Sequence, residues 1–191
     1  MGFLFRTLLS IVAAIAIGVV SAWYAIDWHT GSSTVSVGTK DQWRHNLVIG
    51  TQSANPYDKA VAARQGLVYL PQEDALYFST EVDITGDPLT GACRYRVTGA
   101  NLPSDWWSIS AYDGSGQLMA NEDERYSVTL GDVPPGNFTF ILAGAPQPEL
   151  WLPVETGQPF SLVLRLYGPE PEFSNKPGEI NLPRIEEIDC R

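Results

Sequence analysis

The sequence predicts an all-β fold: an antiparallel β-sandwich with one short helix, behind an N-terminal helix long enough to cross a membrane. Short runs of alternating apolar and polar residues recur from Ala75 onward, and turns rich in glycine and proline separate them. No helical pattern long enough for a β-α-β crossover lies between these runs. Strands joined without crossovers are antiparallel, and two such sheets bury their apolar faces by packing against each other.

The composition limits the partners of the chain. With 191 residues, 44% of them apolar, the chain has enough material for one domain with a core and an appendage. Its 22 acidic and 12 basic side chains give a net charge of −10, which nucleic acid and anionic lipid surfaces repel. No nucleic-acid partner is therefore expected.

The first segment predicts a membrane anchor. Thr7 to Ile26 is an uncharged run of twenty residues, about 30 Å long as a helix, which matches the hydrocarbon core of a bilayer. Arg6 precedes the run, and Trp23, Tyr24 and Trp28 lie at its far end, where an aromatic belt would sit. These flanks predict a single-pass helix with the rest of the chain outside the cytoplasm.

A cleaved signal peptide is the alternative, because Val20-Ser21-Ala22 is an acceptable cleavage site. We favour the anchor, since the apolar part of a signal peptide usually spans about 7–15 residues. The predicted organisation is an anchor over 1–28, a small polar spacer over 29–42 and the β-sandwich over 43–191. Within the spacer, polar and apolar residues alternate over Ser33 to Val37. An edge strand is therefore the alternative interpretation of this stretch.

One helix is predicted in the soluble part, over Asn55 to Gly66. Asn55 is a favoured N-cap, and Pro56 suits the first helical position. Asp58 lies in the first turn, where its charge favours the helix dipole, and Gly66 suits the left-handed position after the helix. We expect this helix to lie across an end or an edge of a sheet.

The predicted strands share an alternating pattern bounded by turn residues. The four prolines at and after Pro169 exclude a central strand, so we expect this tail to wrap the domain in an extended conformation. A short element over Trp43 to Ile49 is expected to pack on the domain. The strands are predicted over Ala75–Val82, Arg94–Val97, Trp107–Ala111, Gln117–Ala120, Tyr126–Leu130, Phe138–Leu142 and Phe160–Tyr167.

The stretch from Asp105 to Leu130 is predicted to be the centre of the fold. Trp107 to Ala111 alternates with a period of two, which places Trp107, Ile109 and Ala111 on a buried face. Asp113 to Gly116 is predicted to form a tight turn, and Gln117 to Ala120 is predicted to form the returning strand. Asn121 to Glu124 is a second, acidic turn.

The two cysteines and two histidines do not form a reactive constellation in the sequence. Cys93 and Cys190 belong to no CxxC motif or Cys/His cluster, so neither a metal site nor a cofactor is expected. Outside the cytoplasm the two thiols could pair and hold the tail on the sandwich, with two unrelated thiols as the alternative. His29 and His45 lie near the anchor, away from any candidate nucleophile.

Two arginines define the candidate site. Arg125 and Arg165 stand close to tyrosines in otherwise apolar strands, where a guanidinium needs a carboxylate or carbonyl partner. We favour the interpretation that these arginines have a structural role, as an ion pair with Asp113. The alternative is that they form an anion-binding site beside aromatic side chains. The tryptophans also have two interpretations: they line a sugar-binding face, or they pack in the core. The candidate binding residues are Trp107, Tyr112, Asp113, Arg125, Tyr126, Trp151, Arg165 and Tyr167.

Between Trp43 and Pro183 several short motifs follow one another in a fixed order. The motifs are Asn55-Pro56-Tyr57 with Ala60 and Ala63, Asp83, Gly86, Pro88-Leu89, Gly91, Tyr95, Leu102-Pro103, Trp107-Ser108, Tyr112-Asp113, Asn121, Arg125-Tyr126-Ser127, Trp151-Leu152-Pro153, Phe160, Arg165-Leu166-Tyr167 and Pro169. With these motifs the chain resembles the domain-of-unknown-function 1214 family. The resemblance implies a bacterial protein with a jelly-roll-like β domain and no established activity. Many members carry a second domain, the 1254 family, ahead of this one, and here the predicted anchor stands in its place.

Together these observations predict a non-catalytic binding module, anchored in the bacterial inner membrane by Thr7 to Ile26 with its β domain in the periplasm. An accessory subunit of a membrane complex is one form of this function. The alternative is a carbohydrate-active hydrolase that uses paired carboxylates. The acids considered for such a pair are Glu81, Asp83, Asp113, Glu122, Asp123 and Glu124.

Overall fold

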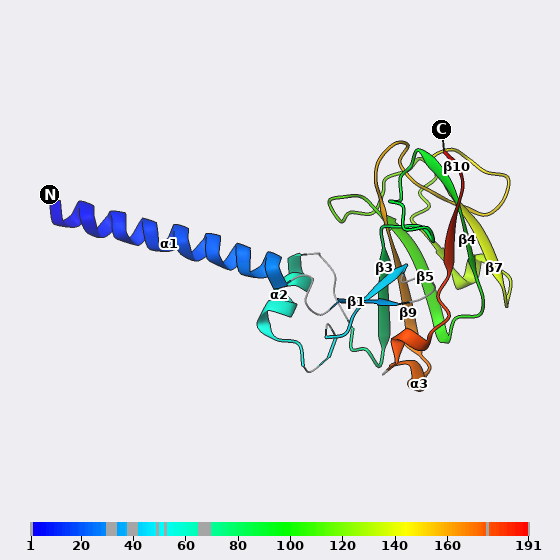
Figure 1. Cartoon of the computed structure of the whole chain (residues 1–191), viewed down its shortest axis with the longest axis horizontal. Coiled ribbons are helices and arrows are strands. Elements are labelled where there is room, and N and C mark those ends of the chain that lie inside the picture. The colour runs from blue at the N-terminus through cyan, green and yellow to red at the C-terminus, as the bar shows by residue number, and fades with distance from the viewer. Residues whose placement is uncertain are drawn as a thin grey trace.

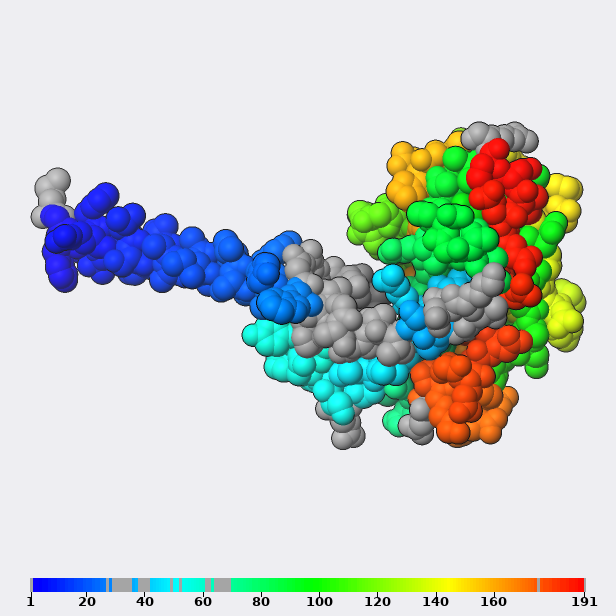
Figure 2. All heavy atoms as spheres, viewed as in Figure 1, coloured from blue at the N-terminus to red at the C-terminus, as the bar shows by residue number. Residues whose placement is uncertain are grey.

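The computed structural model shows a long N-terminal helix projecting from a β domain (Figures 1 and 2). It describes residues 2–29, 34–37, 42–48, 50–51, 53–64, 70–174 and 176–190.

Helix α1, Gly2–His29, has the dimensions of a membrane span or a signal sequence. Its segment Gly2–Ile26 has a mean hydropathy of 2.3, and its most apolar window is buried nowhere inside the protein. Large apolar side chains such as Ile11 and Val20 are exposed along it. An all-apolar surface of this size is stable only against lipid or another apolar partner.

The β domain is a sandwich of two sheets, as the sequence predicts. Within the described residues the strand pairs are antiparallel except β7 with β8, which run parallel. The six-stranded sheet has the order β1 (Thr34–Val37), β2 (Trp43–Asn46), β3 (Ala75–Thr80), β9 (Ser161–Pro169), β5 (Ser104–Tyr112) and β6 (Ser127–Thr129). The four-stranded sheet has the order β10 (Arg184–Cys190), β4 (Cys93–Gly99), β7 (Phe138–Ala143) and β8 (Trp151–Pro153).

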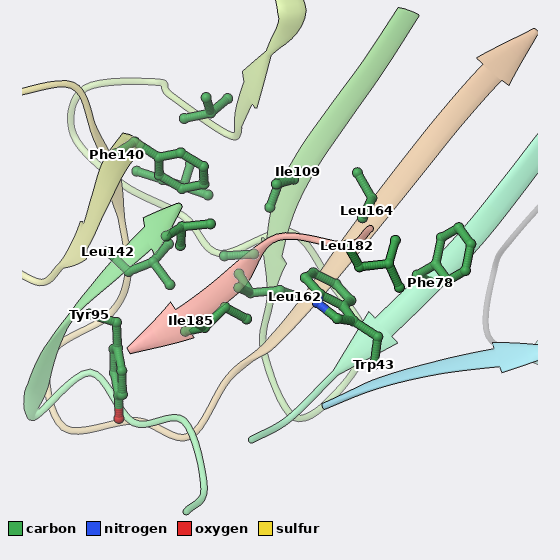
Figure 3. Packing of buried hydrophobic residues seen from close by; sticks show 14 of the residues in the cluster. Trp43, Phe78, Tyr95, Ile109, Phe140, Leu142, Leu162, Leu164, Leu182 and Ile185 are labelled. Atoms are coloured by element: carbon green, nitrogen blue, oxygen red, sulfur yellow. The ribbon is translucent and has the colours of Figure 1, made fainter. Parts of the chain in front are cut away.

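The core lies between the two sheets (Figure 3). Trp107, Ile109 and Ala111 of β5 belong to this core, as predicted, although Ser108 and Ser110 between them are also buried. Trp107 stacks on Phe138 of the facing sheet, with ring centroids 4.6 Å apart. Burying an aromatic pair of this kind supplies a large share of the apolar area that holds a sandwich together.

The tail is more structured than an extended wrap. After Pro169 it forms a helical turn α3 (Pro171–Ser174) and a 3₁₀ turn η3 (Pro177–Glu179), then β10. The prolines end before β10, which pairs only with β4 among the described strands and is therefore an edge strand there, in agreement with the expectation that the tail forms no central strand. The predicted disulfide is present: Cys190 lies opposite Cys93 in the β10–β4 register and is bonded to it.

Helix α2, Pro56–Arg64, begins where the sequence predicts. The Asn55 side chain accepts hydrogen bonds from the backbone N–H groups of Tyr57 and Asp58, and Asp58 accepts one in return from the Asn55 N–H. The helix contacts α1 more than any sheet, which corrects the expected place across a sheet edge (Figure 1). Gly66 and Ile49 lie outside the described residues.

Three further expectations differ from the structure. Gln117 to Ala120 forms no strand, because the turn holds only a single bridge from Tyr112 to Leu118. Leu130 ends β6 early by starting a 3₁₀ turn, η2 (Leu130–Asp132). Within the segment treated as a spacer, Thr34 to Val37 forms edge strand β1, the alternative that the alternation left open.

Candidate functional site

The outer face of the six-stranded sheet carries polar and aromatic residues. Leu162, Leu164 and Leu166 of β9 point into the core, so the residues between them, including Arg165, point outward. Paired residues of neighbouring strands lie on the same face, and four of them form one row across the sheet. This row is Tyr77, Arg165, Ser108 and Thr129, from β3, β9, β5 and β6.

Arg165 is held in place by Tyr112 rather than by an acid. Its Nη2 donates a hydrogen bond to the Tyr112 hydroxyl, and its guanidinium carbon lies 5.4 Å from the centroid of the Tyr112 ring. No ion pair involves Arg165 within the described part of the chain. Since a guanidinium has five N–H donors, most of its hydrogen-bonding capacity is left for a ligand or water.

Trp106 and Tyr167 form an aromatic pair one row along from Arg165. They lie opposite each other in the β5–β9 register, with ring centroids 5.4 Å apart and planes tilted by 50°. Trp106 keeps 41% of its surface exposed, whereas its neighbour Trp107 keeps 2%. An exposed indole beside a tyrosine offers a flat apolar platform with polar edges.

Small hydroxyl side chains lie between these aromatic groups. Ser108 and Ser110 are 6% and 5% exposed, and the structure gives neither hydroxyl a hydrogen-bond partner among the described residues. The Ser104 hydroxyl, further along β5, is fully buried and also lacks a partner there. Buried polar groups are nearly always hydrogen-bonded. The three serine hydroxyls along β5 can therefore still form hydrogen bonds with a ligand or water.

The charged residues at the paired outer positions of this sheet are arginines. Arg44 of β2 pairs with Ser79 and is exposed, and it adds a second arginine to the outer positions. At the outward-facing paired positions of the described strands no aspartate or glutamate occurs. One carboxylate reaches the row from outside the strands, because Asp132 accepts hydrogen bonds from the Thr129 N–H and hydroxyl at the β6 end. The two arginines therefore add positive charge at the β2 and β9 positions of a chain whose net charge is −10.

Trp107 does not belong to this face, although it was among the candidate binding residues. It lies on the core side of β5 and stacks on Phe138, because the strand alternation turns it away from Trp106. The core interpretation of this tryptophan is the one that the packing supports.

The expected ion pair between Asp113 and Arg125 does not form. The Asp113 carboxylate accepts hydrogen bonds from the backbone of Ser115 and Gln117 and from the Ser115 hydroxyl, so it closes its own turn. The Gln117 N–H bond, followed by the Ser115 hydroxyl, lowers the pKa of Asp113 below its usual value. Arg125 instead donates to the Trp151 carbonyl at 3.1 Å and lies 5.6 Å from the Trp151 ring centroid.

Arg125 and Trp151 therefore form a second cluster, where β6 of one sheet comes close to β8 of the other. The buried indole N–H of Trp151 has no partner among the described residues, and Tyr126, next to Arg125 in the sequence, is 41% exposed. In the described part of the chain no hydrogen bond or ring contact joins this cluster to Arg165. Of the candidate residues, the structure thus brings together Tyr112, Arg165 and Tyr167 on one face.

Asp83, the cysteines and His45 are the other groups considered for chemistry, whereas Glu81, Glu122, Asp123 and Glu124 are exposed acids. Asp83, the buried acid considered for a pair, accepts hydrogen bonds from Thr85 and the Asp87 backbone within a turn. Among the described residues one cluster has three possible metal ligands, Cys93, Glu187 and Cys190, and its two sulfurs are joined in the disulfide. His45 is buried against Phe78, and burial lowers its pKa below the usual value.

A family model for proteins of unknown function, DUF1214, matches residues 74–171, which is just over half of the chain. The chain belongs to the DUF1214 family. The matched segment runs from the residue before β3 to the first residue of α3. It includes Tyr77, Trp106, Tyr112, Arg165 and Tyr167, so most of the outer face is part of the family domain, whereas Arg44 lies outside the match.

Two solved structures resemble this DUF1214 chain. The VPA0106 protein from Vibrio parahaemolyticus matches with 25% identity and a TM-score of 0.58, over 71% of this chain and 36% of that one. A putative uncharacterized protein from Burkholderia cenocepacia matches with 21% identity and a TM-score of 0.43, over 62% of this chain and 30% of that one. The chain thus spans about a third of the length of each. No curated protein matches it.

Proposed function

We propose that this DUF1214 protein is a membrane-tethered, non-catalytic binding module that holds its ligand on the outer face of the six-stranded sheet, outside the cytoplasm. The observation that carries the proposal is Arg165. Its guanidinium is fixed over the Tyr112 ring, faces outward and has no acidic partner among the described residues. An arginine that served only the fold would be expected to pair with a carboxylate or with backbone carbonyls.

The location rests on two independent features. The apolar segment Gly2–Ile26 suits a membrane span, and the Cys93–Cys190 disulfide suits an oxidising compartment. We therefore place α1 in a bacterial inner membrane and the β domain in the periplasm. Fusions of alkaline phosphatase and of green fluorescent protein to the C-terminus test this topology. Phosphatase activity without fluorescence is expected, and fluorescence without phosphatase activity would contradict the location.

The non-catalytic part of the proposal rests on how the acids are used. Asp83 and Asp113 each accept several hydrogen bonds inside their own turns, which leaves them poorly placed as a general acid and base. The stretch Glu122 to Glu124 is exposed in a loop. A hydrolase would need two carboxylates about 5–10 Å apart across a bound sugar, and nothing on the aromatic face favours that alternative.

Binding is tested with the full chain in lipid nanodiscs and a solubilised bacterial envelope saccharide fraction. Trp106→Ala removes the exposed platform and is expected to weaken binding about tenfold. Thr139→Ala, at an exposed position of the four-stranded sheet, is the control and should bind as the wild type does. Equal binding by the two variants, or no binding by the wild type, would overturn the proposed face.

An accessory role in a membrane complex is a further part of the proposal, because α1 offers apolar side chains on all sides. Affinity purification from detergent-solubilised membranes tests it. A membrane protein recovered in equal amount with the full chain, and lost when α1 is replaced by an unrelated membrane helix, is the expected result. Recovery of the chain alone would remove the accessory role and leave the binding module.

A further inference from the structure

We propose that the outer face of the six-stranded sheet takes an acidic oligosaccharide, with a sugar carboxylate on Arg165 and a neighbouring ring on Trp106 and Tyr167. The inference rests on the proposed function and names its ligand class. Four observations on the described residues carry it: a guanidinium without an acidic partner, the aromatic pair, the serine hydroxyls of β5 without partners, and paired outer positions without acids.

The guanidinium is already oriented for an anion. The Tyr112 ring and hydroxyl fix it, while most of its N–H donors have no partner among the described residues. A fork of parallel N–H groups matches the two oxygens of a carboxylate. Because the side chain is held before the ligand arrives, little rotamer entropy is lost on binding.

The spacing of the rows decides between a single sugar and a chain of sugars. Residues two apart on a strand are separated by about 7 Å, and Trp106, Ser108, Ser110 and Tyr112 follow at that interval along β5. Arg165 starts opposite Ser108 and reaches toward Tyr112, away from Trp106. Its guanidinium and the aromatic pair are therefore more than one row apart, so the acid group and the stacked ring belong to different sugar units.

The serines lie along β5 beneath the path between the two contacts. Ser108 and Ser110 are more than nine-tenths buried, and their hydroxyls have no partner in the described structure. A hydroxyl both donates and accepts, as sugar hydroxyls do, so the two sets can satisfy each other. The indole of Trp106 is exposed and combines an apolar ring face with a polar N–H. The apolar face of a sugar ring can stack on that indole while the sugar hydroxyls stay in water.

The charge pattern selects an acidic ligand of modest charge. Arg44 adds a second cationic position on β2, about 10 Å from the Arg165 strand across β3. A net charge of −10 on the whole chain opposes a nucleic acid or an extended anionic lipid surface. Local positive charge on an acidic protein instead favours a short chain with a few carboxylates.

The test uses the full chain in nanodiscs and two probes, a galacturonic-acid trisaccharide and its methyl ester, which keeps the rings and removes the charge. The acid is expected to bind at least tenfold more tightly than the ester. Arg165→Gln should remove most of this difference and Arg165→Lys should retain part of it, since lysine keeps the charge without the fork. Arg96→Gln, the same charge change at an exposed position of the four-stranded sheet, should leave the acid affinity within about twofold.

Equal affinity for acid and ester, or equal effects of Arg165→Gln and Arg96→Gln in variants with unchanged near-ultraviolet circular dichroism, would overturn the inference. Displacement of the trisaccharide by an equal concentration of inorganic phosphate would also overturn it, by identifying a phosphoryl site. If the trisaccharide does not bind while the envelope fraction still binds in a Trp106-dependent manner, the ligand class is wrong and the proposed function stands. If neither binds, both fail.

Discussion

The indole Nε1 of Trp43 donates a 2.7 Å hydrogen bond to the carbonyl oxygen of Pro183, 140 residues away in the chain. Trp43 is fully buried and begins β2 of the six-stranded sheet, whereas Pro183 directly precedes β10 of the four-stranded sheet. Gln42 adds a second link, because its side chain bonds the backbone N–H and carbonyl of Ile185. The first strands after α1 and the C-terminal tail thus close one side of the sandwich together (Figure 3).

Trp43→Phe is expected to lower the free energy of unfolding by about 2–3 kcal/mol. The substitution leaves the Pro183 carbonyl without its donor and leaves a cavity beside Leu162 and Leu182. Urea unfolding followed by near-ultraviolet circular dichroism measures the change. Trp106→Phe, at the exposed indole, is the control and should change stability by less than about 0.5 kcal/mol. Equal losses in the two variants would show that the Trp43 bond has no special role.

Reduction of the Cys93–Cys190 disulfide is expected to lower the free energy of unfolding by about 4–5 kcal/mol. The bond closes a loop of 97 residues in sequence separation, which restricts the unfolded chain. Urea midpoints with and without dithiothreitol give the difference. The double variant Cys93→Ser/Cys190→Ser should be insensitive to the reductant, and two free thiols in the air-exposed native protein would disprove the crosslink.

Gly91→Ala is expected to destabilise the domain by about 2 kcal/mol or more. A Cβ atom at Gly91 would lie 1.8 Å from the backbone oxygen of Glu155, so the loop after β8 would have to move. Gly114→Ala is the matched control, because a Cβ there meets no atom within 4 Å. Thermal melting of both variants checks this, and a melting temperature of Gly91→Ala equal to that of Gly114→Ala would refute the close approach.

His45 is expected to make the domain less stable as the pH falls below about 6.5. Burial lowers its pKa from the usual 6.5, so the folded state keeps the ring neutral while the unfolded chain takes up a proton. The stability that the neutral ring contributes is therefore complete above pH 6.5 and is lost as the pH falls toward the lowered pKa. Unfolding free energies at pH 7.5 and 5.5 measure this loss. His45→Gln should reduce it, and an unchanged difference would assign it to other groups.

The sequence predicts most of the local structure and little of the site. The alternation around Trp107 and the cap at Asn55 are local signals, so strand β5 and the start of α2 follow from them. Strands β8 and β10 are missed because one is three residues long and the other follows a run of prolines. The Asp113–Arg125 pair is wrong because a turn aspartate satisfies itself first on nearby N–H groups.

The outer face depends on contacts that no local pattern encodes. Arg165 meets Tyr77 and Ser108 only because β9 inserts between β3 and β5, and these residues are far apart in the chain. The sequence identifies Arg165, Tyr112 and Tyr167 as residues of interest, through unusual polar groups in apolar strands. The alternation along β5 also places Ser108 and Ser110 on the face of Tyr112, but the sequence gives no sign that Arg44 lies on the same face.

The central claim is that the outer face of the six-stranded sheet is the binding surface in the cell. A photoreactive benzoylphenylalanine placed at Tyr167, beside Trp106, tests it in intact bacteria, with the same residue at Thr139 of the four-stranded sheet as the control. The account predicts saccharide adducts on irradiation from position 167 and only background from position 139. Adducts from position 139 with none from position 167 would contradict it.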